Sequence, residues 1–186
     1  MPMEIEAKYK VASFAPIEKA LKKAGATFLG TNHQRDQFFD THDHALRRAD
    51  KGLRLRTIKA VKPANHKGCS QATEPILTFK GPGDKTKSLK IRMEIQTCVN
   101  DAWAITEILK HLGFSPDIVV CKKRSSYALD NCQVELDQLP RIGRFIEVEG
   151  PSQKAVQTMC RQLGLTGKPI TTPYVAMVAK LNHVQQ

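Results

Sequence analysis

Charged side chains at alternate positions are the first feature of the chain that could do chemistry. The segment MEIEAKYK, residues 3–10, carries Glu4, Glu6 and Lys8 at such positions. In an extended strand these three side chains point to one face and the residues between them point to the other. Carboxylates in such a row bind hard divalent cations, and an ammonium group binds anions. One such row is ordinary on a solvated strand, so its meaning depends on whether other segments repeat it.

Six further segments repeat the alternation. They are GLRLRTI, ILTFK, SLKIRMEIQ, CKKRSSY, QVELDQL and FIEVE, and in most of them charges of one sign are grouped together. The basic residues on the shared face are Lys8, Arg54, Arg56, Lys80, Lys90, Arg92, Lys122 and Arg124. The acidic residues on this face are Glu4, Glu6, Glu94, Glu135, Asp137, Glu147 and Glu149.

A face that is charged nearly throughout suits the inside of a closed barrel that binds a highly charged ligand. The basic side chains are numerous enough to surround a triphosphate, because arginine and lysine both bind phosphate oxygens. The carboxylates would hold Mg²⁺ or Mn²⁺, and two such metals clamp the attacking and leaving oxygens of a displacement at phosphorus. No serine or cysteine nucleophile stands out, and phosphoryl chemistry mainly requires positioning and charge neutralisation.

Two other interpretations of the charged face stay open from the pattern alone. An open antiparallel sheet with a solvated, salt-bridged face would show the same alternation. A sheet that binds nucleic acid would share the basic residues, but the acidic residues would repel a phosphate backbone unless metals intervened. The aromatic content of 6% also argues against a nucleic-acid binder built on base stacking.

The elements that must position these side chains are about eight strands and three or four helices, in a single domain over residues 1–186. Short connections favour an antiparallel α+β arrangement with one sheet system. We expect residues 60–75 to form a long mobile excursion and GPG, 81–83, to form a loop. The predicted strands are 3–11, 33–41, 52–58, 76–80, 88–96, 117–129, 132–139 and 144–150. The predicted helices are 16–24, 101–113, 152–163 and 173–181, with a short helical or turn segment at 44–50.

Bulk composition is that of a soluble globular protein. The chain has 186 residues, 41% hydrophobic and 25% charged, and a net charge of +11 that predicts an anionic partner. No apolar run approaches the roughly 20 residues of a membrane helix. Glu4 and Glu6 stand where a signal peptide would need an apolar segment, so we expect a cytoplasmic protein.

Cysteine and histidine spacing predicts no metal site. The five cysteines are scattered, with no C-x-x-C pair, which is typical of reduced thiols in the cytosol. His42 and His44 flank Asp43 in the stretch DTHDH, which we interpret as a polar turn.

The ordered set of segments resembles the CYTH family, the triphosphate tunnel metalloenzymes. EIEAK matches the family signature E-x-E-x-K, and LRLR, LTFKGPG, RMEI, KKRSSY, VELDQL and FIEVE follow in the family's order. The final PYVAMV resembles its late S-Y-x-x-L segment, although Thr172 and Pro173 precede Tyr174 where the family usually has serine. The chain looks most similar to the class IV adenylyl cyclase group.

The resemblance implies a closed eight-stranded antiparallel β-barrel, or tunnel, with a charged interior, helices packed outside and a site that depends on Mg²⁺ or Mn²⁺. It implies that Glu94 supports the basic residues, and alternation points Lys123 outward. The implied metal ligands are Glu4, Glu6, Glu147 and Glu149, with Glu135 and Asp137 as contributors. The implied triphosphate-binding residues are Lys8, Arg54, Arg56, Lys80, Arg92, Lys122 and Arg124.

Family resemblance leaves the reaction open. A cyclase would convert ATP to cyclic AMP and pyrophosphate, whereas a triphosphatase would hydrolyse tripolyphosphate or thiamine triphosphate. A non-catalytic module that binds polyphosphate or nucleotide is the third alternative. We expect a small-molecule triphosphate as the partner, no nucleic acid and no membrane, and a homodimer is common in the cyclase group.

Overall fold

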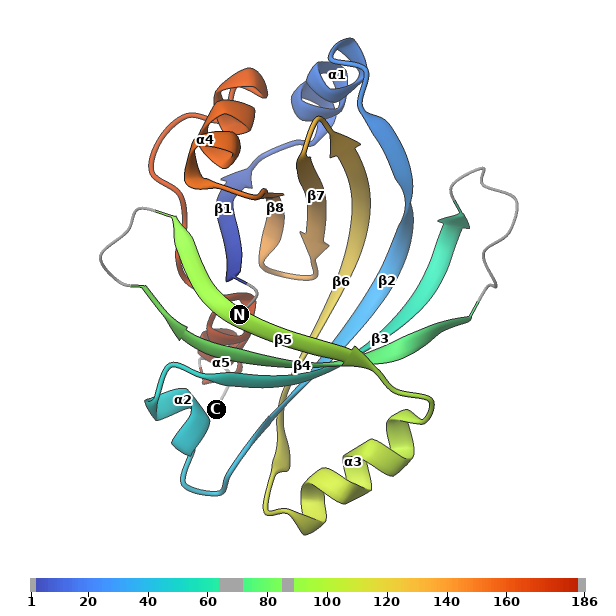
Figure 1. Cartoon of the computed structure of the whole chain (residues 1–186), viewed down its shortest axis with the longest axis vertical. Helices are drawn as coiled ribbons and strands as arrows, with labels where there is room; N and C mark the ends of the chain where they lie inside the picture. Colours follow the sequence, from blue (N-terminus) through green and yellow to red (C-terminus); the bar gives the residue numbers. More distant parts are fainter. Residues whose placement is uncertain (1–2, 64–71, 85–88, 184–186) are drawn as a thin grey trace.

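The computed structural model describes residues 3–63, 72–84 and 89–183, which form a closed antiparallel barrel (Figure 1). Around the barrel the strands follow the order β1-β5-β4-β3-β2-β6-β7-β8, and β1 closes it by pairing with both β5 and β8. The strands are β1 Met3–Val11, β2 Thr27–Asp40, β3 Gly52–Pro63, β4 Ala72–Gly83, β5 Lys90–Cys98, β6 Ser115–Leu129, β7 Cys132–Leu139 and β8 Gly143–Glu149. The helices are α1 Ala15–Lys23, α2 Ala45–Arg48, α3 Ala102–His111, α4 Gln153–Gln162 and α5 Tyr174–His183.

The predicted closed barrel is confirmed, and three details of its strands were wrong. The strand predicted over 33–41 is β2, which begins at Thr27. Residues 60–63 and 72–75 extend β3 and β4, so the described ends of the expected excursion are strand, and 64–71 lie outside the described residues. GPG lies inside β4, where a register shift between Lys80 and Gly83 lets the proline sit in the strand. Gly81 is buried there, and a Cβ on it would lie 3.3 Å from the Met93 side chain.

Helix ends follow the local signals in the sequence. The Asp101 carboxylate accepts the backbone N–H groups of Trp103 and Ala104 at the start of α3, and Ser152 accepts that of Ala155 at the start of α4. Gly113 follows α3 with a φ of +87°, which glycine adopts without strain. At the start of α1 the capping position is Phe14, and Ser13 Oγ accepts the N–H of Ala15.

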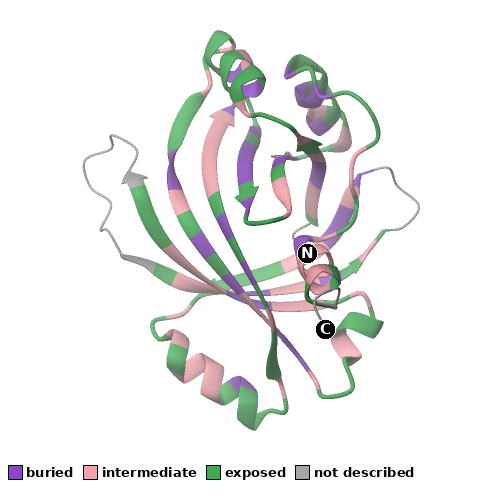
Figure 2. Cartoon of the chain, turned by 180° about the vertical axis from the view of Figure 1, so that it is seen from behind, coloured by how far each residue is buried: buried purple, intermediate pink, exposed green. Residues whose placement is uncertain are grey.

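Apolar strand faces outside the barrel are covered by α1, α3 and α4. Leu21 of α1 and Val156 of α4 pack with Val134 and Ile146 in the larger core cluster, at one end of the barrel (Figure 1). Leu109 of α3 packs in a second cluster at the opposite end. Buried and exposed residues alternate along the strands, as a barrel with two different faces requires (Figure 2). No helix in the described ranges is long and apolar enough to cross a membrane.

Helix α5 is placed differently from the other helices. Its Tyr174 packs with Val120, Leu139 and Phe145, residues that share the inward faces of β6, β7 and β8. Tyr174 and Val175 also line the barrel cavity. The C-terminal helix therefore forms part of the interior wall.

Candidate active site

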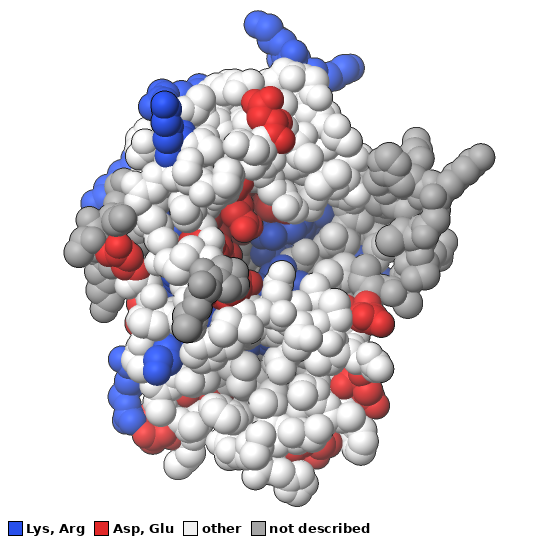
Figure 3. All heavy atoms as spheres, in the orientation of Figure 1, with Lys and Arg blue, Asp and Glu red and all other residues white. Residues whose placement is uncertain are grey.

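The barrel encloses a cavity of about 930 Å³, and the predicted charged face is its wall. Every predicted site residue lines this cavity except Asp137, which is fully buried behind Lys122 and Arg124. Acidic and basic side chains are visible together in a hollow of the molecular surface (Figure 3). Lys123 is exposed, as alternation predicts.

On the wall formed by β1, β4 and β5, each lysine faces a carboxylate. Lys80 Nζ lies 3.0 Å from both carboxylate oxygens of Glu4 and 2.5 Å from Oε2 of Glu94. Lys90 pairs with Glu6 in the same way. The contact with Lys80 and a second one with Arg54 agree with the supporting role predicted for Glu94.

The opposite wall, formed by β6, β7 and β8, is organised around Arg124. Its guanidinium donates to Asp137 and to Glu147, with Nε 2.6 Å from Asp137 Oδ1 and Nη2 2.6 Å from Glu147 Oε2. Lys122 donates to Asp137 at 3.0 Å, and Lys8 lies 3.8 Å from Glu147. Asp137 and Glu147 are therefore already bound by cations, which leaves them less free to hold a metal.

Asp36 of β2 is a site residue that the sequence reasoning missed. Its carboxylate is 3% exposed and accepts two hydrogen bonds from Arg56, at 2.6 and 2.7 Å, while Arg54 lies 3.9 Å away. Burial works to raise the pKa of Asp36, but the Arg56 hydrogen bonds and charge hold that pKa well below its usual range. Asp36 is thus an ionised carboxylate that orients two arginines toward the cavity.

Glu149 is a carboxylate of the cavity wall with no ion pair among the residues that the structure describes. It lies opposite Glu6 across the β1–β8 pair. The residue is exposed overall, but partial desolvation of its carboxylate, together with the charges of Glu4, Glu6 and Glu94, raises the pKa of Glu149 to about 7. We call Glu4, Glu6 and Glu149 the acidic group. Its excess negative charge is what a bound divalent cation would neutralise, so these residues fit a metal.

Two lysines of the wall are incompletely neutralised. Burial lowers the pKa of Lys122 to about 8, and the neighbouring Arg124 lowers it further against the pull of Asp137. Burial also lowers the pKa of Lys8, although Glu147 opposes the shift. An anion bound between these two lysines would favour their charged forms.

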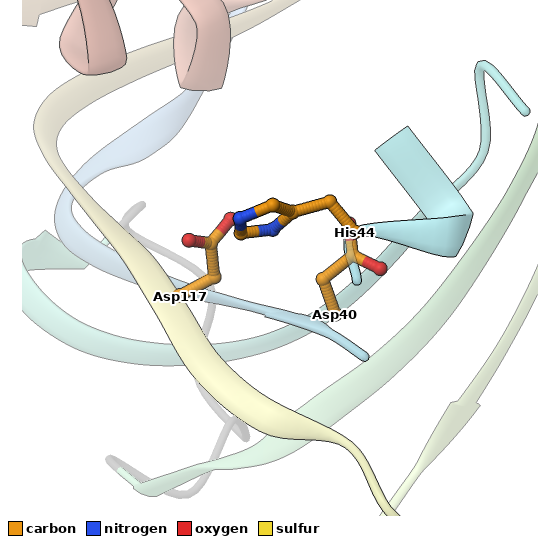
Figure 4. A group of neighbouring side chains, drawn as sticks. All are labelled: Asp40, His44 and Asp117. Atoms are coloured by element: carbon orange, nitrogen blue, oxygen red, sulfur yellow. The ribbon is translucent and has the colours of Figure 1, made fainter. Parts of the chain in front are cut away.

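A second cluster of ligand-type side chains lies at α2, beside the cavity (Figure 4). Asp40, His44 and Asp117 bring one ligand atom each within 4.8 Å of one another, and the His44 ring points toward Asp117. Asp40 already accepts the backbone N–H groups of Thr41, Leu46 and Arg47, and Asp117 pairs with the Arg47 side chain. Asp40 and His44 belong to the stretch that the sequence indicates as a polar turn. With Asp117 they have the spacing of a cation site, but most of the carboxylate oxygens already accept hydrogen bonds or form an ion pair.

The chain is similar to a known family and to known proteins over most of its length. The family model for the CYTH domain matches residues 2–165. The chain belongs to the CYTH family. A putative adenylate cyclase of Methanocaldococcus jannaschii is 28% identical over 147 residues, 79% of this chain and 76% of the relative. Adenylate cyclase CyaB of Aeromonas hydrophila is 25% identical over 180 residues, 91% of this chain and 84% of the relative.

Solved structures share the barrel of this CYTH chain. The PH1012 protein of Pyrococcus horikoshii is 28% identical, with a TM-score of 0.74 over 92% of this chain and 97% of that one. A putative adenylyl cyclase from Hippeastrum, described as having a dominant triphosphatase activity, is 16% identical, with a TM-score of 0.70 over 95% of both chains. At that identity the likeness concerns the fold alone. The CYTH match and the curated relatives named as adenylate cyclases support an enzymatic function in general.

Proposed function

We propose that the protein is a metal-dependent enzyme that converts ATP, bound inside the barrel, to cyclic AMP and pyrophosphate. The observation that carries the proposal is a single cavity that joins a cationic wall, the acidic group and an apolar wall. These three surfaces match the triphosphate, the metal and the nucleoside of a metal–nucleotide complex. The cyclase and ATP assignments draw on the names of the curated relatives.

The cationic wall would hold the triphosphate. Arg54 and Lys122 are nearly buried, and their charges are only partly offset by carboxylates, so a phosphate chain would complete their pairing. Arginine forks and lysine ammonium groups also stabilise the charge that develops when the ribose 3′-hydroxyl attacks the α-phosphorus and pyrophosphate leaves. The residues proposed for this role are Lys8, Arg54, Arg56, Lys80, Arg92, Lys122 and Arg124.

The acidic group would hold the metal. Glu149 has no described cation partner, and Glu4 and Glu6 have one lysine each, so these three carboxylates together carry more negative charge than their partners neutralise. A bound Mg²⁺ or Mn²⁺ would neutralise phosphate charge and make the phosphorus more electrophilic. We assign Glu135, Asp137 and Glu147 chiefly to orienting Arg124 and Lys122, because they already contact these cations.

The apolar wall favours an organic substrate over tripolyphosphate. Phe38, Ile118 and Val120 line the same cavity as the charged residues, and Val175 and Ala176 of α5 face them. A nucleoside has an apolar ring that benefits from such a surface, and inorganic tripolyphosphate has none.

Hydrolysis of a triphosphate is the second candidate function. The observation in its favour is the Hippeastrum neighbour, which carries the adenylyl cyclase name and is described as dominantly a triphosphatase. Cyclase and triphosphatase would use the same cations and metal and differ in which phosphorus faces the nucleophile. Tripolyphosphate and thiamine triphosphate are the substrates to compare with ATP.

A cytoplasmic location, a homodimer and a single domain over residues 1–186 stay predictions.

The deciding experiment is ³¹P NMR of the protein with Mg²⁺ or Mn²⁺, in separate tubes with ATP, tripolyphosphate and thiamine triphosphate. Cyclic AMP and pyrophosphate from ATP would support the cyclase. Orthophosphate released from any of the three without a cyclic product would support the triphosphatase. Inactivity in all tubes, together with measurable binding, would leave only the binding module.

A matched pair of variants tests the metal assignment. Glu4→Gln removes one carboxylate of the acidic group, so turnover should be abolished while tripolyphosphate still binds to the cations. Glu107→Gln is the control, because Glu107 makes only a surface ion pair with Lys110. Full activity of Glu4→Gln would refute the assignment of Glu4 to the metal.

A further inference from the structure

Tyr174 is a buried tyrosine of the cavity to which the charge pattern assigns no role. It begins α5, beyond residue 165 where the family match ends. Its side chain is held firmly, because the residue is 9% exposed and its ring packs edge-on against Phe145 at 5.2 Å. Tyr174 also lines the cavity itself.

The ring of Tyr174 lies beneath two of the lysines proposed to bind phosphate. Lys8 Nζ is 4.3 Å from the ring centroid and Lys122 Nζ is 5.0 Å from it. Ammonium groups at these distances are attracted to the face of an aromatic ring. The ring therefore brings together two lysines from β1 and β6 that contact different carboxylates, Glu147 and Asp137.

The hydroxyl of Tyr174 has no hydrogen-bond partner among the described residues, although it is buried. Buried hydroxyl groups nearly always have a partner, because leaving one unpaired is costly. Tyr174 as a residue lines a cavity whose wall holds the incompletely neutralised lysines Lys8 and Lys122. This combination indicates a ligand atom that accepts a hydrogen bond and carries negative charge.

The hydroxyl is suited to donate its proton in a hydrogen bond and unsuited to lose it. Burial raises the pKa of Tyr174 far above its usual value, and the nearby charge of Glu147 raises it further. The group stays protonated at any physiological pH, so it acts as a neutral donor. A phosphate oxygen is the acceptor that the adjacent lysines would bring to it.

We propose that the Tyr174 hydroxyl donates a hydrogen bond to a phosphate oxygen of the substrate, at the position where Lys8 and Lys122 converge. Helix α5 would then complete the phosphate site of the barrel. The inference rests on the proposed function, since it assumes that the cavity binds a triphosphate. It adds a substrate-contacting residue from α5, which begins after residue 165, where the match to the family model ends.

The test is Tyr174→Phe, which removes the hydroxyl and keeps the ring beneath both lysines. Calorimetric titration with inorganic tripolyphosphate in EDTA measures phosphate binding without turnover. We expect binding about 10-fold weaker or more, the size of one hydrogen bond to a charged group. The melting temperature of the ligand-free variant should be unchanged or higher, because the wild-type hydroxyl has no protein partner to lose.

Tyr127→Phe is the matched control, because Tyr127 packs against Phe28 in the outer core and does not line the cavity. It should leave the affinity for tripolyphosphate unchanged. Wild-type affinity in Tyr174→Phe, or a clear fall in its melting temperature, would overturn the inference while leaving the proposed function intact. Failure of the wild-type protein to bind tripolyphosphate or ATP would refute the proposed function and this inference with it.

Discussion

Replacing Asp36 by asparagine should destabilise the ligand-free protein and strengthen triphosphate binding at the same time. The carboxylate of Asp36 accepts two hydrogen bonds from Arg56, and Arg54 lies close by. The substitution keeps the shape of the side chain and removes its charge. Two arginines then stay in the wall without the carboxylate that neutralises them.

The size of the stability loss follows from burial of the pair. Asp36 is 3% exposed and the Arg56 side chain is 12% exposed, so water replaces little of the lost interaction. Breaking a buried ion pair by removing one partner costs about 3–5 kcal/mol. At about 2–4 °C per kcal/mol for a chain of this size, the melting temperature should fall by about 6–20 °C.

The effect on binding has the opposite sign. A triphosphate that reaches Arg56 in the wild-type protein competes with Asp36 for the same guanidinium, and in the variant it meets no competitor. We expect tripolyphosphate to bind about 10-fold tighter, a gain of about 1.4 kcal/mol. Saturating ligand should then recover much of the lost melting temperature, because a ligand that binds only the folded state stabilises it.

Thermal melts with and without tripolyphosphate in EDTA, together with calorimetric titration, measure both effects. Glu107→Gln serves as the surface control, and its stability should change by less than about 1 kcal/mol. Weaker tripolyphosphate binding by Asp36→Asn would refute the reasoning, since it would mean that Asp36 prepares the arginines for the anion more than it competes with it. A melting temperature within 2 °C of wild type would show that the pair is not effectively buried.

Three further predictions follow from the same wall and from the core. Arg54→Ala should weaken tripolyphosphate binding at least about 10-fold by calorimetry, and unchanged affinity would place the anion elsewhere. The raised pKa of Glu149 means that this group's contribution to folding stability is present below about pH 4.5 and is lost as pH rises through about 7. Glu149→Gln should therefore melt higher than wild type at pH 8 in EDTA and not at pH 5, and an equal difference at both pH values would contradict this. Leu21→Ala, at a fully buried position of α1, should cost about 2–5 kcal/mol in urea unfolding and leave tripolyphosphate affinity unchanged.

Alternation along seven strands was enough to predict most of the charged side chains that line the cavity. Because the strand period is two, assigning Ile5 and Ala7 to one face fixes Glu4 and Glu6 on the other. The amphipathic helices then identified the apolar face as the outer one, which α1 and α4 cover. Both steps depend only on local sequence, and the structure confirms them.

Asp36 escaped prediction because its strand does not alternate cleanly. Phe38 and Phe39 are adjacent and both apolar, which hides the period of two. The structure shows the reason, since Phe38 packs toward α5 inside the barrel and Phe39 packs with Leu55 and Leu109 outside it. The sequence pattern alone could not predict an apolar inner surface at one end of the tunnel, because that surface depends on the position of α5.

The lengths of β3 and β4 were underestimated for a different reason. Their outer ends pair through the backbone, as Gly30 does with Pro63 and Lys59 with Ala72, and residues 59–61 of β3 are exposed. A hydrophobic pattern predicts a strand only where one face is buried. Main-chain hydrogen bonds leave no comparable signal in the sequence.

The position of β1 in the barrel has a consequence for how the molecule is made. The ribosome completes β1 first among the strands, but one of its neighbours, β8, is completed last. During synthesis the nascent first strand must wait with unpaired edges, and pairings between segments so distant in sequence form slowly. Glu4, Glu6 and Lys8 all belong to β1, whereas Glu149 belongs to β8. The acidic group is therefore complete only when β1 and β8 have paired. If the acidic group binds a metal as proposed, the recovery of metal binding after dilution from denaturant would measure the rate of barrel closure.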